Sequence, residues 1–337
     1  MKHYIEKCLA GEGLTVGEAS GALELIMAGQ ATDAQIAGLL IALRARGETV
    51  DEVVGFARTM RERSIKVRVD DPDAIDIVGT GGDGLGTFNI STVASFVASG
   101  AGVTVAKHGN RSVSSQSGSA DLLTALGVNI QLPPDRVQDS INRLGVGFLF
   151  APMFHPAMKS AAKARSELGV RTIFNMVGPI TNPANVKRQL VGAYSRDAAG
   201  ILAGALRELQ SDQSCVVHSD DGMDEVALSG ETHVVEVRGY EALRSYALSA
   251  AQLGLESHPL GSARGGTKED NAAIAMNVLH GARGPARDVV LANAAVGIYV
   301  GGKAKTPREG ATMASASIDS RRALEKLRAF VEFTNRP

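Results

Sequence analysis

The sequence IDIVGTGGDGLGTFNIST occupies residues 75–92 and joins a short apolar run to a glycine-rich loop and then a helical pattern. Residues 75–78 predict a buried strand, because the run is short, rich in branched side chains and bounded by glycine. Glycines let backbone N–H groups approach an anion closely, and the helix start adds hydroxyls and the positive end of its dipole. The stretch therefore predicts an α/β fold with a phosphate site at the end of a strand.

Apolar runs of strand length continue after this loop, and helical patterns separate them. The further strand candidates are residues 103–106, 146–150, 190–194, 215–218 and 233–237. Helical patterns include residues 92–99 and 119–126, and a long one over 306–333 with a weak interruption at 315–320. Alternation of this kind predicts a central, mainly parallel sheet covered by helices.

The first seventy residues differ, because they contain only helical patterns. Three helix starts carry a capping box, in which a threonine and a side chain three residues later satisfy each other's backbone donors. The pairs are Thr15 with Glu18, Thr32 with Gln35, and Thr49 with Glu52. The sequence DDPD at residues 70–73 breaks the helical pattern and is the predicted domain boundary.

Composition limits the classes of function. A chain of 337 residues is long enough for two domains, and its net charge of −1 gives no overall field for nucleic acid or an anionic membrane. Cys8 and Cys215 lie far apart, which favours reduced thiols in a cytoplasmic protein. The chain start lacks the apolar segment of a signal peptide, and no apolar run reaches the roughly 20 residues that span a bilayer.

Gly79, Gly81 and Gly84 match the dinucleotide-binding pattern G-x-G-x-x-G. The helix does not open within that pattern, and the next strand ends in KHGNR at residues 107–111 instead of an acidic residue. A nicotinamide enzyme is therefore disfavoured, although an enzyme that recognises the 2′-phosphate of such a dinucleotide remains an alternative. No G-K-[ST] follows, so the loop is not a P-loop. A simple turn is the remaining alternative.

Two polar loops follow other predicted strands. Lys107, Asn110 and Arg111 would place cationic and amide donors beside the glycine loop, where they suit phosphate oxygens. The loop SDDGMDE at residues 219–225 has four carboxylates within six residues, and Mg²⁺ takes one or two carboxylates together with substrate oxygens. The alternatives are a solvated basic loop and an ordinary polar turn.

Arg165 stands on a predicted helix that opens near His155 and runs to about residue 167. Its neighbours at helical spacing are Ala161, Ala162 and Leu168, so one guanidinium lies on a small apolar face. An arginine in such surroundings can hold a carboxylate with two parallel hydrogen bonds. A surface arginine whose stem covers apolar atoms is the alternative.

Seven motifs together resemble the anthranilate phosphoribosyltransferase family over nearly the whole chain. They are GTGGD at residues 79–83, TFNIST at 87–92, KHGNR at 107–111, SGSAD at 117–121, HPAMK at 155–159, GPITNP at 178–183 and DGMDE at 221–225. The resemblance implies a nucleoside phosphorylase and phosphoribosyltransferase-like architecture, with a small all-helical domain and a large α/β domain. The helical domain would comprise residues 1–70 and 168–187, and the α/β domain residues 71–167 and 188–337.

The resemblance also implies a homodimer whose contacts are made by the helical domain, through the apolar face around Leu39 and Leu43. The enzyme would transfer the phosphoribosyl group of phosphoribosyl pyrophosphate to anthranilate, the second step of tryptophan biosynthesis from chorismate. Both partners would be small molecules, with no nucleic acid and no membrane. The alternatives are a pyrimidine nucleoside phosphorylase-like enzyme and a non-catalytic paralogue that binds nucleic acid.

Site residues follow from the resemblance, one motif position at a time. Phosphoribosyl pyrophosphate would be held by Gly79, Gly82, Asp83, Thr87, Asn89, Ile90, Ser91, Thr92, Lys107, His108, Gly109, Asn110, Arg111, Ser112, Val113, Ser114, Ser115 and Ser119. Anthranilate would meet Gly79, His108, Asn110, His155, Arg165 and Gly178. Two Mg²⁺ ions per subunit would be bound by Ser91, Asp224 and Glu225, and catalytic roles would fall to Asp83, Lys107 and Arg165. Phe154 departs from members with a second histidine there, which leaves the amine path less defined.

Overall fold

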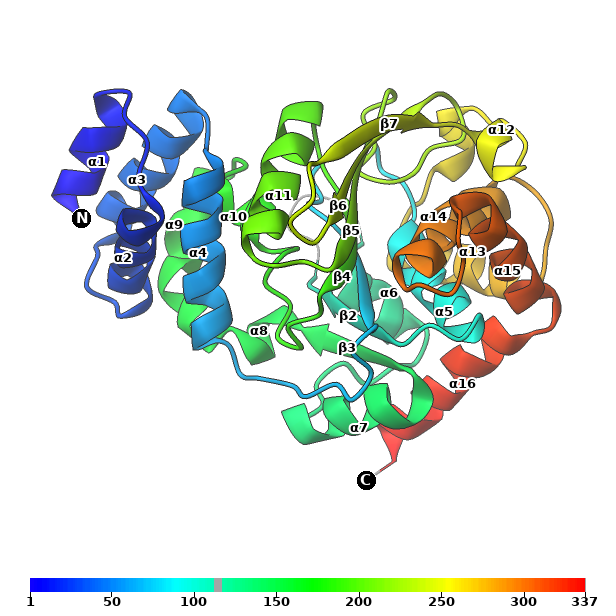
Figure 1. Ribbon diagram of the computed structural model, residues 1–337. Helices are drawn as coiled ribbons and strands as arrows, with labels where there is room; N and C mark the ends of the chain where they lie inside the picture. The colour runs from blue at the N-terminus through cyan, green and yellow to red at the C-terminus, as the bar shows by residue number, and fades with distance from the viewer. Residues whose placement is uncertain (112–116, 337) are drawn as a thin grey trace.

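The computed structural model describes residues 1–111 and 117–336, and it begins with a bundle of helices (Figure 1). The first four helices are α1 (Lys2–Leu9), α2 (Val16–Met27), α3 (Asp33–Arg46) and α4 (Val50–Arg63). All three predicted capping boxes are confirmed, because each threonine accepts from the backbone three residues on and the partner side chain returns to the threonine N–H. These boxes fix where α2, α3 and α4 begin.

Two later helices complete this bundle. They are α9 (Lys159–Leu168), which packs on α2 and α3, and α10 (Ile173–Val177), which packs on α3 and α4. Buried side chains of this bundle share one apolar cluster with α11 (Arg196–Glu208) and with one face of the sheet. The exact limits of the two predicted domains, at residues 168 and 187, stay a prediction.

The predicted dimer face is wrong. Leu39 and Leu43 are fully buried inside this chain, within the bundle core. Their helical spacing indicated an apolar face that needs a partner, and that partner is the bundle itself. On α3 the large apolar side chain that faces solvent is Ile41, which is 41% exposed.

A seven-stranded sheet forms the centre of the molecule, in the order β3-β2-β1-β4-β5-β6-β7. The strands are β1 (Ile75–Gly79), β2 (Val105–Gly109), β3 (Val146–Phe150), β4 (Arg188–Gly192), β5 (Gln213–Ser219), β6 (Thr232–Arg238) and β7 (Arg244–Leu248). β1 to β5 pair in parallel, and β6 runs antiparallel to both β5 and β7, which confirms the mainly parallel sheet. β7 had no sequence signal, because it is a mostly exposed edge strand without an apolar run.

Several strand boundaries differ from the prediction by one to three residues, and two of these differences have the same cause. β2 begins at Val105, because the buried Val103 lies in the turn before the strand and contributes to the core from there. β4 ends at Gly192, two residues before the predicted limit, since Ala193 is buried in the loop that follows. Apolar runs mark burial, and burial continues beyond the hydrogen-bonded ladder.

Helices cover both faces of the sheet (Figure 1). On one side lie α11 and, beyond it, the helical bundle; on the other, α5 (Ile90–Gly100), α6 (Ser119–Ala125), α13 (Lys268–Leu279), α14 (Pro285–Val300), α15 (Pro307–Asp319) and α16 (Arg322–Asn335). The long C-terminal pattern divides at Arg321, which has a positive φ of 65°. The smaller elements are α7 (Pro134–Leu144), α8 (Ala151–Phe154), η1 (Pro156–Met158), α12 (Ala250–Leu253) and η2 (Leu260–Ala263). Within residues 1–111 and 117–336, no helix combines the length and apolarity that crossing a membrane requires.

Glu52 gives a test of the bundle. Its carboxylate is fully buried, accepts from the N–H groups of Leu14 at 2.8 Å and Thr49 at 2.9 Å, and pairs with Arg46. Glu52→Ala should lower the free energy of unfolding by about 3–5 kcal/mol, because it removes a buried carboxylate from a mostly buried arginine and from two backbone donors. Urea unfolding measures this, with Glu62→Ala on the exposed face of the same helix as control. Equal stability of the two variants would contradict the assignment.

Candidate active site

The carboxyl ends of β1, β2, β4 and β5 converge where the strand order reverses. β1 pairs with β2 on one side and with β4 on the other, so the sheet grows in opposite directions from β1. Gly79 lies opposite Gly192 at the ends of β1 and β4. In open α/β sheets such a reversal opens a crevice at the carboxyl ends of the strands, and ligands bind there. The predicted glycine loop, basic strand end and acidic loop all lie at this edge.

The glycine loop takes a conformation that favours glycine. Gly81, Gly82, Gly84 and Gly86 have φ values of 65°, 74°, 76° and 65°, in the left-handed region that other residues rarely adopt. Gly79 is needed for a different reason, because a Cβ there would lie 2.4 Å from Oδ2 of Asp224. The loop therefore turns repeatedly and still lies against the acidic loop.

Asp224 and Glu225 lock the acidic loop to this glycine loop. The N–H of Gly81 donates to Oδ2 of Asp224 at 2.7 Å, and the N–H of Ser91 donates to Oε1 of Glu225 at 3.1 Å. A Cβ on Gly192 would lie 1.6 Å from the carbonyl oxygen of Asp224, so only glycine allows this approach. The three predicted metal ligands, Ser91, Asp224 and Glu225, are thus brought together.

Burial and mutual repulsion disfavour the charged forms of the two carboxylates. Desolvation is the main cause that raises the pKa of Asp224, and the negative charge of the nearby Asp83 adds to it. Desolvation likewise raises the pKa of Glu225, with a further contribution from Asp224. A divalent cation favours the charged form of such a pair, so the donor set fits Mg²⁺. Within the described part of the chain, no three His, Cys, Asp or Glu side chains form a metal cluster. A cation here would therefore take further oxygens from a substrate or water.

Lys107 supplies the positive charge beside this pair. It is 4% exposed, and its Nζ donates to the carbonyl of Ile77 at 2.5 Å and to Oγ of Ser91 at 3.3 Å. Burial lowers the pKa of Lys107, while Asp76 and Glu225 act in the opposite direction. Asp76, on β1, accepts from the His108 N–H at 3.2 Å and from Nδ2 of Asn182 at 2.8 Å. The ammonium group therefore lies at the start of α5, as the phosphate hypothesis requires.

His108 and His155 form a buried pair beside the chain of Gly178. Their ring centroids are 5.2 Å apart, and burial lowers the pKa of His108 to about 3 and of His155 to about 4. The backbones of Gly178 and Thr181 oppose these shifts only in part. Both rings are therefore neutral at pH 7, and they form an uncharged wall.

Arg165 lies on α9, and its side chain packs against α10. Its guanidinium carbon lies 4.8 Å from the ring centroid of Phe174 on α10, and burial lowers its pKa. Among the described residues no carboxylate pairs with Arg165, so its hydrogen-bonding fork stays available. Ala161 is buried, whereas Ala162 is exposed, so Ala162 does not belong to the buried face of this helix.

The remaining predicted residues divide into three groups. The first group continues from the glycine loop into α5 and consists of Thr87, Asn89, Ile90 and Thr92. Asp83, within the loop, accepts a hydrogen bond from the Leu85 N–H at 3.1 Å. In the second group, Oγ of Ser119 donates to the Asn110 carbonyl at 3.2 Å, beside Gly109. Arg111 forms an ion pair with Asp121 at 2.8 Å, a partner that the sequence did not indicate. Ser112, Val113, Ser114 and Ser115 lie outside the described residues.

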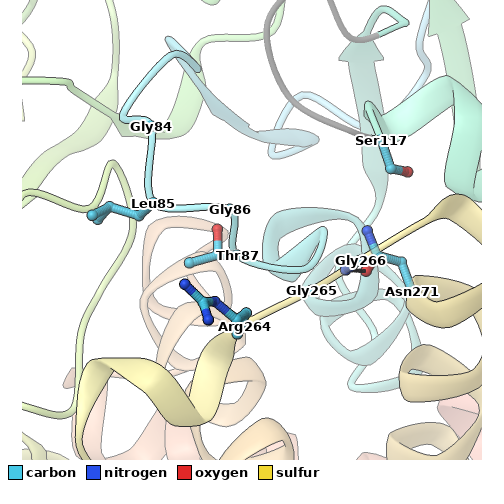
Figure 2. A pocket seen from close by; sticks show the side chains of 9 residues that line it. All are labelled: Gly84, Leu85, Gly86, Thr87, Ser117, Arg264, Gly265, Gly266 and Asn271. Atoms are coloured by element: carbon cyan, nitrogen blue, oxygen red, sulfur yellow. Dashed lines mark hydrogen bonds between the residues drawn. The ribbon is translucent and has the colours of Figure 1, made fainter.

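Sequence reasoning missed two contributions to the site. Arg171 reaches from the bundle to the glycine loop, donating to the Gly82 carbonyl at 3.1 Å and lying over the Tyr194 ring at 4.5 Å. Residues 264–271 close a cavity of about 410 Å³ against the glycine loop (Figure 2). It is lined by Gly84, Leu85, Gly86, Thr87, Ser117, Arg264, Gly265, Gly266 and Asn271. The adjacent Gly265 and Gly266 were the available signal for a second backbone-lined wall.

Known proteins share both parts of this architecture. Residues 2–64 match the family described as glycosyl transferase family, helical bundle domain, and residues 71–324 match its a/b domain. The fold and the site thus define a glycosyl transferase with a helical bundle and an α/β domain. The chain belongs to the anthranilate phosphoribosyltransferase family, because it is 51% identical to that enzyme of Moorella thermoacetica over 98% of this chain and 97% of the relative.

Solved structures agree with this assignment. The anthranilate phosphoribosyltransferase of Thermus thermophilus has a TM-score of 0.93 at 44% identity, with 99% of each chain covered. The enzyme from Saccharomyces cerevisiae, in complex with PRPP and Mg, has a TM-score of 0.91 at 30% identity, with 99% of this chain and 97% of that chain covered. PRPP is phosphoribosyl pyrophosphate.

Gly192 tests the contact between β4 and the acidic loop. Gly192→Ala should lower the free energy of unfolding by about 1–3 kcal/mol, because the added Cβ forces backbone apart in a packed region. Gly200→Ala is the matched control: Gly200 is exposed on α11, with no atom within 4 Å of an added Cβ, and should gain stability. Denaturant titration of both variants checks the pair. Wild-type stability of Gly192→Ala would refute the described approach.

Proposed function

We propose that the protein transfers the 5-phosphoribosyl group of phosphoribosyl pyrophosphate to the amine of anthranilate. The products are N-(5-phospho-β-D-ribosyl)anthranilate and pyrophosphate, in the second step of tryptophan biosynthesis from chorismate. One observation carries the proposal: the glycine loop after β1, the buried Lys107 and the acidic pair Asp224 and Glu225 meet at one edge of the sheet. The curated relatives and the solved structures that match the chain bear the name of this activity.

Mg²⁺ is the cofactor in this proposal, with two ions per subunit. The yeast relative was solved with PRPP and Mg, and this chain has carboxylates suited to such an ion. Ser91, Asp224 and Glu225 would hold the metal. When bound, Mg²⁺ neutralises charge on the pyrophosphate and so makes it a better leaving group.

The residues of this chain then position the reactants. The anthranilate nitrogen attacks C1 of the ribose from the face opposite the pyrophosphate, so the configuration at C1 inverts. The C1–O bond to pyrophosphate breaks, and Lys107 with the loop N–H groups stabilises the negative charge that leaves. Asp83 lies beside Asp224 and would help to orient the pyrophosphate end. Effective catalysis here depends on holding the nitrogen and C1 in line.

The acceptor side needs a carboxylate clamp and little else. Arg165 would bind the anthranilate carboxylate with its fork of N–H donors. Neutral His108 and His155, together with Gly178 and Asn110, would line the path of the aromatic ring. An aromatic amine is already neutral at pH 7, so no strong base is needed before attack, and the nitrogen releases one proton to water after its bond to C1 has formed.

The rival functions lack comparable support. A pyrimidine nucleoside phosphorylase would use phosphate as nucleophile and would not need the Asp224 and Glu225 pair for a pyrophosphate-bound metal. A nucleic-acid-binding protein requires a basic surface, whereas the net charge here is −1. Neither rival explains Arg165, a half-buried arginine without a carboxylate partner among the described residues.

We also propose that the chain forms a homodimer in the cytoplasm through its helical bundle. The face around Leu39 and Leu43 is buried within the chain, so the contact would use exposed apolar side chains such as Leu9 and Ile41 on the neighbouring helices α1 and α3. Two buried free thiols, Cys8 and Cys215, suit a reducing compartment.

A fluorescence assay tests the activity. Anthranilate emission is followed after the protein, phosphoribosyl pyrophosphate and Mg²⁺ are combined; the chain has no tryptophan, so the protein background is low. We expect loss of signal in proportion to enzyme, and no loss with EDTA or with the Asp224→Asn, Glu225→Gln double variant. Failure of the wild-type protein to consume anthranilate would reject the proposed acceptor. Full activity of the double variant would reject its metal site.

Arg165→Ala should raise the anthranilate KM about 10- to 100-fold, because it removes ~1.5–3 kcal/mol of charged hydrogen bonding. The KM for phosphoribosyl pyrophosphate should change little. Lys163→Ala is the matched control, since Lys163 is on the same helix and pairs with Asp33 at the surface. Steady-state kinetics on both substrates checks this, and an unchanged anthranilate KM removes Arg165 from the site.

A further inference from the structure

Residues 263–271 form a strap along the second half of the glycine loop. The Phe88 N–H donates to the Ala263 carbonyl at 3.1 Å, and the Gly265 N–H donates to the Gly86 carbonyl at 2.8 Å. Between these bonds, Thr87 and Arg264 form an antiparallel bridge. The loop that follows β1 is therefore held by backbone bonds from a segment far later in the chain.

Asn271, on α13, joins this strap to the loop through its side chain. It is 2% exposed; its Oδ1 accepts the Gly266 N–H at 2.9 Å, and its Nδ2 donates to Oδ1 of Asn89 at 3.1 Å. Gly265 lies so close to Asn271 and to the glycine loop that no side chain fits at this position. A Cβ on Gly265 would lie 2.6 Å from Oδ1 of Asn271 and 2.7 Å from the Phe88 backbone. Figure 2 shows Asn271 and the two strap glycines on the cavity wall.

Asn89 is held on both sides by this arrangement. Besides the hydrogen bond from Asn271, Oδ1 of Asn89 accepts one from Oγ of Ser117 at 3.2 Å. Nδ2 of Asn89 donates to the Ser117 carbonyl at 3.0 Å. These bonds fix the orientation of the amide, because turning it over would place donors against donors. Asn89 also precedes α5, and two residues later the Ser91 N–H holds Glu225.

We propose that Asn271 is a positioning residue for phosphoribosyl pyrophosphate, acting through Asn89. It orients the Asn89 amide and the start of α5, and so sets the end of the glycine loop on which the ligand is bound. Asn271 itself touches no reacting atom. The inference rests on the proposed function, and it adds a residue outside every motif that predicted the site.

A role in α13 alone is the competing explanation, because Asn271 also accepts a backbone N–H at the start of that helix. Thr267 and Asp270 already form a capping box there. Asn271→Asp keeps the shape and the acceptor for Gly266, and it replaces the donor to Asn89 by an oxygen. This change therefore disturbs Asn89 and leaves the helix start bonded.

The test compares steady-state kinetics of Asn271→Asp with Asn277→Asp, an equal charge change on the exposed face of the same helix. We expect the phosphoribosyl pyrophosphate KM of Asn271→Asp to rise about 10-fold or more, with kcat and the anthranilate KM changed less than about threefold. The control should match wild type. An unchanged KM, or kcat and both KM values moving together with a lower Tm, overturns the proposal.

A double-mutant cycle supplies the second readout. Asn271→Ala should raise the same KM in the wild-type background and add little once Asn89 is alanine, because its effect passes through Asn89. Equal effects in both backgrounds overturn the proposal. An inactive wild-type protein would instead reject the proposed function, so the two failures are distinguishable.

Discussion

The structure depends on one close approach, that of the Asp224 backbone and carboxylate to the ends of β1 and β4. Gly79 and Gly192 make it possible, because any side chain at either position would overlap Asp224. The approach brings a loop after β5 onto the loop after β1, so that N–H groups of one hold carboxylates of the other. Segments that are distant in the sequence thus form one continuous surface at this edge of the sheet.

Charge at this surface is arranged in opposed pairs. The acidic pair has raised pKa values, Lys107 has a lowered one, and the two histidines beyond are neutral. Burial is the largest cause of every one of these shifts, because it disfavours the charged form of each group. Arg165, on α9, lies over the Phe174 ring and has no carboxylate partner among the described residues.

The sequence predicted features that are local. A capping box involves residues three apart, so Thr15, Thr32 and Thr49 identified their helices directly. Most strands were found from apolar runs, whereas β7 was missed because an exposed edge strand has none. The face of Leu39 and Leu43 was read correctly as buried and wrongly as intermolecular, because periodicity reports burial without naming the partner.

The sequence by itself therefore determined the fold class and the capped helix starts, and it predicted the glycine loop as a phosphate site. Only the tertiary structure decided that Arg171 bonds Gly82, that Arg111 pairs with Asp121 and that Asn271 holds Asn89. The reason is physical: helix caps and strand patterns depend on neighbours in sequence, whereas these bonds join groups that meet only once the sheet has set its strand order. A polar side chain gives no sign in the sequence of which distant partner it will meet.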